Sequence, residues 1–257
     1  MNQKISILGC GWLGSALAVQ LISKGYNVYG STTSISKVRE FKAKGITPFV
    51  INIEDENTDI SNFLSSDILI IAITSKNISA IKNLIFKIEK SNIRKVLFIS
   101  STSVYPNING IATEETETNS SPLVEIENLF KTNTIFKSTI IRFGGLFGYD
   151  RKPENFFKPG RIIDNPEGYV NLIHQDDCIR IIEHIILKNT WDVVLNACSD
   201  SHPTRREFYL NEAEKAGKPL IIFNEASENN YKIINSEKLK SLLDYDFKYA
   251  DLMNYRK

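Results

Sequence analysis

The chain has 257 residues, a size typical of one large α/β domain or of a nucleotide-binding domain with a small extra lobe. Its hydrophobic and charged fractions, 42% and 24%, are those of an ordinary globular protein. The net charge of +1 argues against nucleic acid or an anionic membrane as a partner. The cysteines Cys10, Cys178 and Cys198 are few and lie in apolar surroundings, so we expect reduced, buried thiols and no metal site.

An uncharged stretch, Ile5 to Ile22, must be distinguished from a targeting segment. Only Ile5 to Leu8 precedes the small residues at Gly9 and Cys10, and a secretory signal needs about 7 to 15 apolar residues before its cleavage site. The glycines and Gln20 within the stretch suit a turn and a helix better than a membrane span. We therefore expect a cytoplasmic chain.

The same stretch contains glycines at the spacing Gly-x-Gly-x-x-Gly. They follow a short apolar run, and apolar residues then recur at helical intervals. Strand, tight turn and helix in this order are typical of a dinucleotide-binding site, in which the helix N-terminus faces the phosphates. We predict that the pyrophosphate lies against Gly9, Gly11, Trp12, Leu13 and Gly14.

A second strand is predicted at Asn27 to Tyr29, and the residues after it bear on the choice of cofactor. An acidic side chain there binds the ribose of NAD, whereas a nearby cation accommodates the 2′-phosphate of NADP. No acidic residue occurs before Glu40, and the segment instead offers Ser31, Thr32, Thr33, Ser34 and Lys37. This favours NADP, with NAD as the second choice. The alternative is that Ser34 or Ser36 only caps the helix predicted at 37–44.

Strands and helices then alternate along the chain. Strands are predicted at 46–53, 67–74 and 95–100, a helix at 77–90, and a short helical stretch around Phe63. Regular alternation indicates a parallel, doubly wound sheet, whose ligands bind at the carboxyl ends of the strands. The residues expected on the nicotinamide side are therefore Ala72, Ile73, Thr74 and Ser100.

The fifth strand runs into the string Phe98-Ile-Ser-Ser-Thr-Ser-Val-Tyr-Pro106. Together with the glycine spacing, this string resembles the extended short-chain dehydrogenase/reductase superfamily, which includes nucleotide-sugar epimerases and dehydratases. The resemblance implies that Ser101, four positions before Tyr105, contacts the reacting oxygen of the substrate. The alternative is that residues 100–103 only bond the backbone of a turn.

The Tyr-x-x-x-Lys pair of that superfamily is missing, because no tyrosine here has a lysine four residues on. The lysine lowers the pKa of the catalytic tyrosine, which is otherwise near 10. Its absence points to the atypical branch, in which the chain resembles the YeeZ-like proteins. The candidates for proton transfer are then Tyr105, Tyr149 and His174, and a histidine titrates near physiological pH.

Later segments extend the resemblance over nearly the whole chain. Residues 139–148 resemble the family's strand and loop over the substrate, 171–177 its His-x-Asp-Asp element, and 195–209 its seventh strand and next helix. Among the loop cations, Arg142 included, one arginine could grip a diphosphate, and the candidate substrate-binding residues are Tyr149, Arg151 and Arg161. The alternatives are that Asp176 or Asp177 caps a helix, that His174 holds a loop and that the arginines are solvated.

These patterns predict a single Rossmann-type domain over residues 1–257, with an α/β doubly wound parallel sheet of about seven strands. A small substrate lobe is expected from residues 149–171 and 199–257, ending in a strand at 231–234 and a capped helix at 236–243. The resemblance implies an NADP-binding oxidoreductase or an epimerase-like protein that acts on a small or sugar-nucleotide substrate. The alternatives are a non-catalytic NADP-binding or redox-sensing regulator and, more weakly, a flavin or NAD binder. The chain could also form a homodimer, which no residue of the sequence decides.

Overall fold

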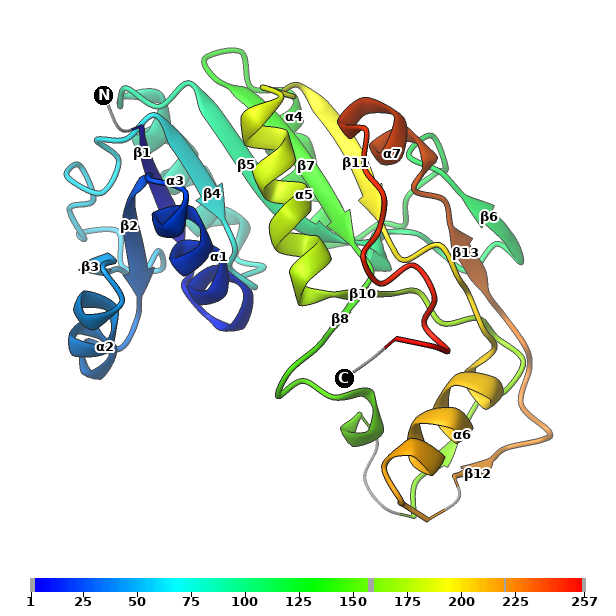
Figure 1. Ribbon diagram of the computed structural model, residues 1–257. Coiled ribbons are helices and arrows are strands. Elements are labelled where there is room, and N and C mark those ends of the chain that lie inside the picture. The colour runs from blue at the N-terminus through cyan, green and yellow to red at the C-terminus, as the bar shows by residue number, and fades with distance from the viewer. Residues whose placement is uncertain (1–2, 157–159, 220, 256–257) are drawn as a thin grey trace. The chain divides into compact units, whose positions relative to one another are not determined.

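A computed structural model describes residues 3–156, 160–219 and 221–255 (Figure 1). Its largest sheet has seven strands in the order β11-β7-β5-β4-β1-β2-β3. The strands are β1 (Lys4–Leu8), β2 (Asn27–Thr32), β3 (Thr47–Val50), β4 (Ile68–Ile71), β5 (Lys95–Ser101), β7 (Lys137–Phe143) and β11 (Val193–Ala197). β1 pairs in parallel with both β2 and β4, so the predicted doubly wound parallel sheet is confirmed.

Some of the helices lie between strands of the sheet in the sequence, and others come after the last of these strands. They are α1 (Trp12–Ser23), α2 (Val38–Ala43), α3 (Ile78–Glu89), α4 (Pro122–Lys131), α5 (Gln175–Leu187), α6 (Arg205–Lys215) and α7 (Glu237–Leu243). Three short 3-10 helices are η1 (Ile35–Lys37), η2 (Thr102–Val104) and η3 (Pro153–Asn155). Among the described residues, no helix combines the length and the apolar character that a membrane span requires.

The chain divides into two compact units. Residues 1–100, 120–141 and 182–194 form the first, and residues 101–119, 142–181 and 195–257 form the second. The second unit contains both segments of the predicted substrate lobe, and their role as a lobe stays a prediction. It also holds three two-stranded pairings, of β6 (Gly110–Ala112) with β13 (Lys232–Ile234), β8 (Gly145–Phe147) with β10 (Leu172–His174), and β9 (Ile162–Ile163) with β12 (Ile222–Phe223).

The core of the first unit follows from the sequence pattern. All four residues of β4 are buried, as expected for a strand covered on both faces. On α3 the buried positions recur at three- and four-residue intervals, and the Asn77 side chain accepts a hydrogen bond from the Ala80 amide at 3.1 Å. Gly25 and Gly45, with φ of +88° and +77°, end α1 and α2.

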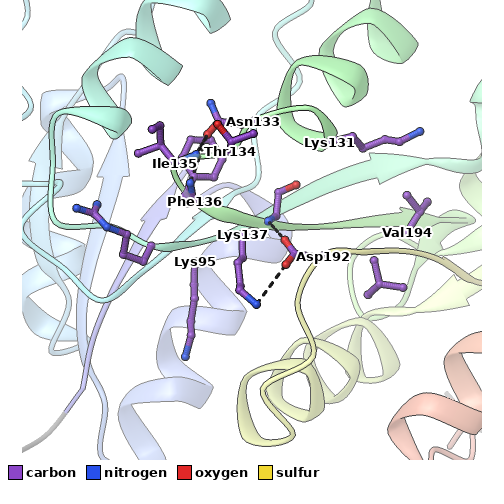
Figure 2. Close-up of a pocket in the computed structure, with 12 residues that line it drawn as sticks. Lys95, Lys131, Asn133, Thr134, Ile135, Phe136, Lys137, Asp192 and Val194 are labelled. Carbon is purple, nitrogen blue, oxygen red and sulfur yellow. Dashed lines mark hydrogen bonds and ion pairs between the residues drawn. The ribbon is translucent and has the colours of Figure 1, made fainter.

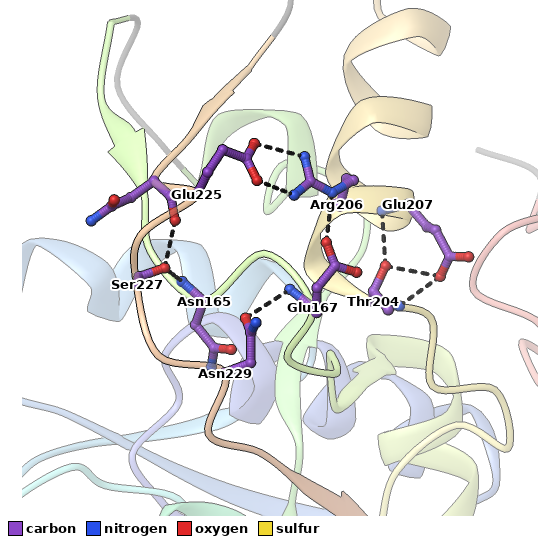
Figure 3. A network of polar contacts seen from close by, with 9 residues as sticks. Asn165, Glu167, Thr204, Arg206, Glu207, Glu225, Ser227 and Asn229 are labelled. Carbon is purple, nitrogen blue, oxygen red and sulfur yellow. Dashed lines mark hydrogen bonds and ion pairs between the residues drawn. The ribbon is translucent and has the colours of Figure 1, made fainter.

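The second unit has its own apolar cluster, centred on Phe147, Leu172 and Phe208. Beside it, Figure 3 shows the Arg206 guanidinium of α6 facing Glu225, with N–O distances of 2.7 and 3.1 Å, while its Nε donates to Glu167 at 2.7 Å. Thr204 and Glu207 form a capping box at the start of α6. These contacts join α6 to the segments on either side of it in the sequence.

Three local predictions are wrong. Around Phe63 there is only a turn, with one hydrogen bond from the Leu64 amide to the Ile60 carbonyl, because so short a segment cannot propagate a helix. β2 extends through Thr32, since its last residues pair with β3. Ser236 precedes α7 without capping it, because its hydroxyl bonds both backbone groups of Cys198.

Candidate functional site

The predicted order of strand, tight turn and helix is present between β1 and α1. Gly9 has φ of +98°, and a Cβ there would lie 2.7 Å from the carbonyl oxygen of Ala72. A Cβ at Gly14 would overlap the carbonyl oxygen of Gly9. The fold itself therefore requires glycine at both positions.

Gly11 differs from the other two glycines of the motif. Its φ is −81°, and a Cβ there would meet nothing within 4 Å. It is the N-cap residue of α1 and has no side chain with which to cap the first amides of the helix. No contact in the structure explains glycine at this exposed position, whereas a phosphate that approached the helix N-terminus would.

Ser31 supports the turn from β2. Its hydroxyl accepts a hydrogen bond from the Gly9 amide at 2.9 Å, and its carbonyl accepts one from the Cys10 amide at 2.9 Å. Burial raises the pKa of the Cys10 thiol to about 12, although the Ser31 backbone and Lys37 act in the opposite direction. The thiol is therefore protonated near neutral pH. All three cysteines are buried and free, as predicted.

The other residues predicted near the adenosine phosphate lie just beyond Ser31. Thr32 and Ser34 are half-buried, and Thr33 and Lys37 are exposed. Ser34 precedes η1 but makes no side-chain capping bond; its hydroxyl lies 2.7 Å from that of Ser36. Among the residues with described positions, Lys37 has no ion pair. That these side chains bind the adenosine phosphate of the cofactor stays a prediction.

The carboxyl end of β4 lies beside the glycine turn, as predicted. The Ala72 amide donates to the Leu8 carbonyl at 2.8 Å, and both Ala72 and Ile73 stand against Gly9. Thr74, next along the chain, is exposed. The structure thus brings Gly9, Ala72 and Ile73 together within the first unit.

Ser100 is buried at the end of β5 and bonds a carboxylate that sequence reasoning missed. Its hydroxyl donates to Oε1 of Glu127 at 2.5 Å, and Glu127 is 1% exposed. Glu127 comes from α4, the helix on which the resemblance places the tyrosine and lysine. Its neighbours Ile126 and Phe130 are also buried, so a charged residue on the apolar side of α4 was the available signal.

Ser101 opens the η2 turn of the second unit. Its hydroxyl oxygen accepts a hydrogen bond from the Ser103 amide at 3.1 Å, which is the turn-bonding role set out as the alternative. The hydroxyl hydrogen can still be donated to a ligand. The contact of Ser101 with a reacting oxygen stays a prediction.

Tyr105 is enclosed, at 1% exposed, and its hydroxyl hydrogen is donated to a protein group. It donates to Oδ1 of Asn196 at 2.9 Å and accepts from Nη1 of Arg142 at 2.6 Å. Burial raises its pKa, against the opposing effect of Arg142. The half-buried Lys232, whose pKa burial lowers, donates from Nζ to the Tyr105 carbonyl. Sequence reasoning missed Lys232 and Asn196.

Tyr105→Phe is expected to lower the free energy of unfolding by about 1 to 3 kcal/mol, because it removes partners of the buried Arg142 and Asn196 side chains. Tyr149→Phe is the matched control, since Tyr149 is 63% exposed and should cost less than about 1 kcal/mol. Urea denaturation measures both. Equal stabilities of the two variants would contradict the structural role of Tyr105.

Tyr149 and His174, the other two candidates for proton transfer, lie together in the second unit with ring centroids 5.5 Å apart. The Tyr149 hydroxyl donates to Oδ1 of Asp176 at 2.7 Å, and Lys248 Nζ donates to Oδ2 at 2.7 Å. His174 is 6% exposed, and its Nδ1 accepts from the Asp176 amide at 3.1 Å. Burial lowers the pKa of His174, although Asp176 and Asp177 oppose the shift. A neutral His174 therefore holds this loop.

This lowered pKa makes stability depend on pH. Because unfolding restores the ordinary pKa of 6.5, the unfolded chain takes up a proton at His174 that the folded chain does not. The stabilisation is complete above about pH 6.5 and is lost as the pH falls below it. We expect His174→Gln to flatten the decline in the urea midpoint between about pH 7 and pH 5. An unchanged decline would contradict this account.

The predicted substrate arginines are both exposed. Arg151 closes a tight turn in which its amide donates to the Gly148 carbonyl at 2.9 Å, and Tyr149, in this turn, has φ of +53°. Arg161 precedes β9. The structure therefore brings Tyr149 and Arg151 into one turn, while Arg142, the third loop cation, is buried against Tyr105.

Asp176 and Asp177 lie within the first turn of α5. Asp176 bonds Tyr149 and Lys248, as above. The buried Asp177 accepts from the Tyr245 hydroxyl at 2.6 Å and from the Lys248 and Tyr249 amides at 2.7 and 3.0 Å. Asp177 thus holds the C-terminal segment, a role that helix-capping arguments did not anticipate.

Comparisons with known proteins agree with this fold. A functionally unknown conserved protein from Silicibacter pomeroyi superposes with a TM-score of 0.82 at 18% identity, over 98% of this chain and 96% of that one. UDP-glucuronic acid 4-epimerase from Bacillus cereus, in complex with UDP-glucuronic acid and NAD, superposes with a TM-score of 0.81 at 21% identity, over 97% and 95%. At these identities the likeness establishes the fold alone.

Sequence comparison adds a family model and a relative to these likenesses. Residues 4–103 match the model described as NADP oxidoreductase coenzyme F420-dependent. Protein YeeZ of Escherichia coli strain K12 is 29% identical over 271 aligned residues, covering 97% of each chain. The chain is similar to Protein YeeZ over nearly its whole length. The residues that match the family model, 4–103, include the glycine turn and the first four residues of the Ser100–Tyr105 segment.

Proposed function

We propose that the chain binds a pyridine dinucleotide at the glycine turn. Gly11 carries this proposal, because it is the one glycine of the motif that the fold does not require. The uncapped N-terminus of α1 supplies backbone amides and a favourable dipole for a pyrophosphate. The matched NADP oxidoreductase model and the NAD complex of the epimerase support the same class of cofactor.

NADP is the preferred form in this proposal. The segment after Ser31 offers the Thr32, Thr33 and Ser34 hydroxyls and the Lys37 ammonium to a 2′-phosphate. The first acidic residue of the chain is Glu40. Its Oε1 lies 2.6 Å from Nζ of Lys44, so its negative charge is paired with a nearby ammonium group. Lys37→Glu should therefore reverse the preference towards NADH, because it places a carboxylate where NAD-binding proteins have one.

The proposed reaction is oxidoreductase or sugar-nucleotide epimerase chemistry on a small-molecule substrate. The cofactor would supply the hydride-transfer chemistry. Ser101 donates its free hydroxyl hydrogen to the reacting oxygen. Tyr149 is the best remaining proton donor, because it is exposed whereas Tyr105 and His174 are buried. A hydrogen bond to Asp176 raises the pKa of Tyr149, which favours its protonated form.

The same burial of Tyr105 and His174 favours the second candidate, a non-catalytic NADP-binding or redox-sensing protein. The two functions are separated by incubating the purified chain with NADPH or NADP⁺ and a panel of carbonyl and sugar-nucleotide compounds. Substrate-dependent change in NADPH absorbance, lost in Ser101→Ala, is expected for the enzyme. Cofactor binding with neither such a change nor conversion of any sugar nucleotide to its epimer would overturn the enzymatic proposal and leave the binding protein.

A further inference from the structure

A hollow of about 790 Å³ lies in the first unit, at the amino ends of three strands (Figure 2). Lys95, Lys137 and Val193, the first residues of β5, β7 and β11, are among its lining residues. The glycine turn follows the carboxyl end of β1. In a parallel sheet these are opposite edges, so the hollow is separate from the proposed cofactor site.

The charge lining this hollow is strongly unbalanced. It contains four cations, Arg94, Lys95, Lys131 and Lys137, and one carboxylate, Asp192. Asp192 is engaged by Lys137 at 3.4 Å and by the Ser138 amide at 3.2 Å. In the part of the chain with described positions, the other three cations have no carboxylate partner. The net charge of the whole chain is only +1, so the lining of this hollow is more positive than the chain as a whole.

The cations are partly oriented by their surroundings. Nη1 of Arg94 donates to the Ser91 and Ile93 carbonyls, each at 2.8 Å, which holds the guanidinium in place. Figure 2 shows the Lys95 and Lys137 side chains running alongside each other from neighbouring strands. Two ammonium groups presented side by side suit a group that carries more than one negative charge.

Apolar side chains complete the lining. Phe136 is buried, Val193 and Val194 are half-buried, and Ile135 is half exposed. An inorganic ion would leave this surface in water, whereas a ligand with an apolar or aromatic body would cover it.

A second hollow of the same unit, of about 540 Å³, provides an internal contrast. Its lining balances Glu56 and Asp59 against Lys87 and Lys90. Lys87 also donates to the Glu56 and Thr58 carbonyls at 3.0 Å. A solvated groove with balanced, internally bonded charges is the ordinary case, and the first hollow departs from it.

We propose that the hollow lined by Arg94, Lys95, Lys131 and Lys137 binds a small organic polyanion, namely a nucleoside diphosphate or a compound of the same chemistry. The phosphates contact Lys95 and Lys137, whose side chains run alongside each other (Figure 2), and the base lies on the apolar residues. This site is independent of the proposed cofactor site and does not require the proposed function to be correct.

The test is calorimetric titration of the full chain with ADP in the presence of excess NADPH. The lining variant Arg94→Gln/Lys95→Gln/Lys131→Gln should bind ADP at least about tenfold more weakly, because charge-assisted bonds are lost. The control Lys24→Gln/Lys42→Gln/Lys90→Gln removes the same charge from exposed positions elsewhere and should bind as the unmodified chain does. The NADPH affinity of the lining variant, measured alone, should not change.

Several results would overturn the site: no ADP binding at about 1 mM, equal weakening in both triple variants, or unchanged affinity in the lining variant. Unfolding midpoints establish that each variant is folded. The single variant Lys95→Gln serves if the triple variant is unstable, and it should weaken ADP binding about threefold. Pyrophosphate and adenosine, titrated separately, show whether charge and apolar body both contribute.

Discussion

Gly14→Ala is expected to destabilise the chain by about 2 to 3 kcal/mol, whereas Gly11→Ala should cost less than about 1 kcal/mol and still weaken NADPH binding at least about tenfold. At Gly14 the added methyl group would overlap the Gly9 carbonyl oxygen. This oxygen belongs to the backbone of the turn and cannot shift to make room. At Gly11 the same methyl group enters open space, the space that a pyrophosphate would fill.

Urea denaturation and NADPH titration of both alanine variants measure these effects. The substitution is identical at the two positions, so the comparison separates a glycine that the fold needs from one that a ligand needs. If Gly11→Ala bound NADPH as tightly as the unmodified chain, Gly11 would not face the cofactor. If Gly14→Ala were fully stable, the packing of α1 against the turn would be wrong.

Asp177→Ala is expected to lower the free energy of unfolding by about 3 to 5 kcal/mol, because a buried carboxylate that accepts hydrogen bonds from Tyr245, Lys248 and Tyr249 is removed. The Tyr245 hydroxyl and the two amides would lose their acceptor. The segment 245–249 should then exchange its amide hydrogens faster.

Asp176→Ala is the matched control for this prediction, since the neighbouring carboxylate bonds side chains alone at its Oδ atoms, the exposed Tyr149 and Lys248 and the half-buried Tyr249 hydroxyl. It should cost about 1 kcal/mol. Urea denaturation and hydrogen exchange of both variants provide the measurement. Equal losses at the two positions, or protection of residues 245–249 that survives in Asp177→Ala, would show that Asp177 does not anchor the C-terminal segment.

Local patterns in the sequence were sufficient to predict the central sheet. The continuous apolar run at β4, the helical stripe of α3 and the glycines that end α1 and α2 each act through neighbouring residues, so their spacing determines the structure. The glycine turn was predictable for the same reason. The turn around Phe63 was wrongly predicted as a helix, because the stretch is too short for its apolar residues to distinguish the two.

The polar partners within the candidate site could not be predicted from spacing. Ser100 meets Glu127 across 27 residues, Tyr105 meets Asn196 across 91, and Lys232 meets the Tyr105 carbonyl across 127. Ser31, predicted as a cofactor ligand, has its hydroxyl bonded to the Gly9 amide, a contact that exists only because β1 and β2 are neighbours. Tertiary pairing, which local sequence does not encode, decides these roles.

Direct titration of the purified chain with NADPH and NADH tests the central claim, that a pyridine dinucleotide lies on the glycine turn. The account predicts saturable binding of both, tighter for NADPH, with the preference reversed in Lys37→Glu and the affinity reduced in Gly11→Ala. Absence of saturable binding for either nucleotide, or affinities that neither variant alters, would contradict it.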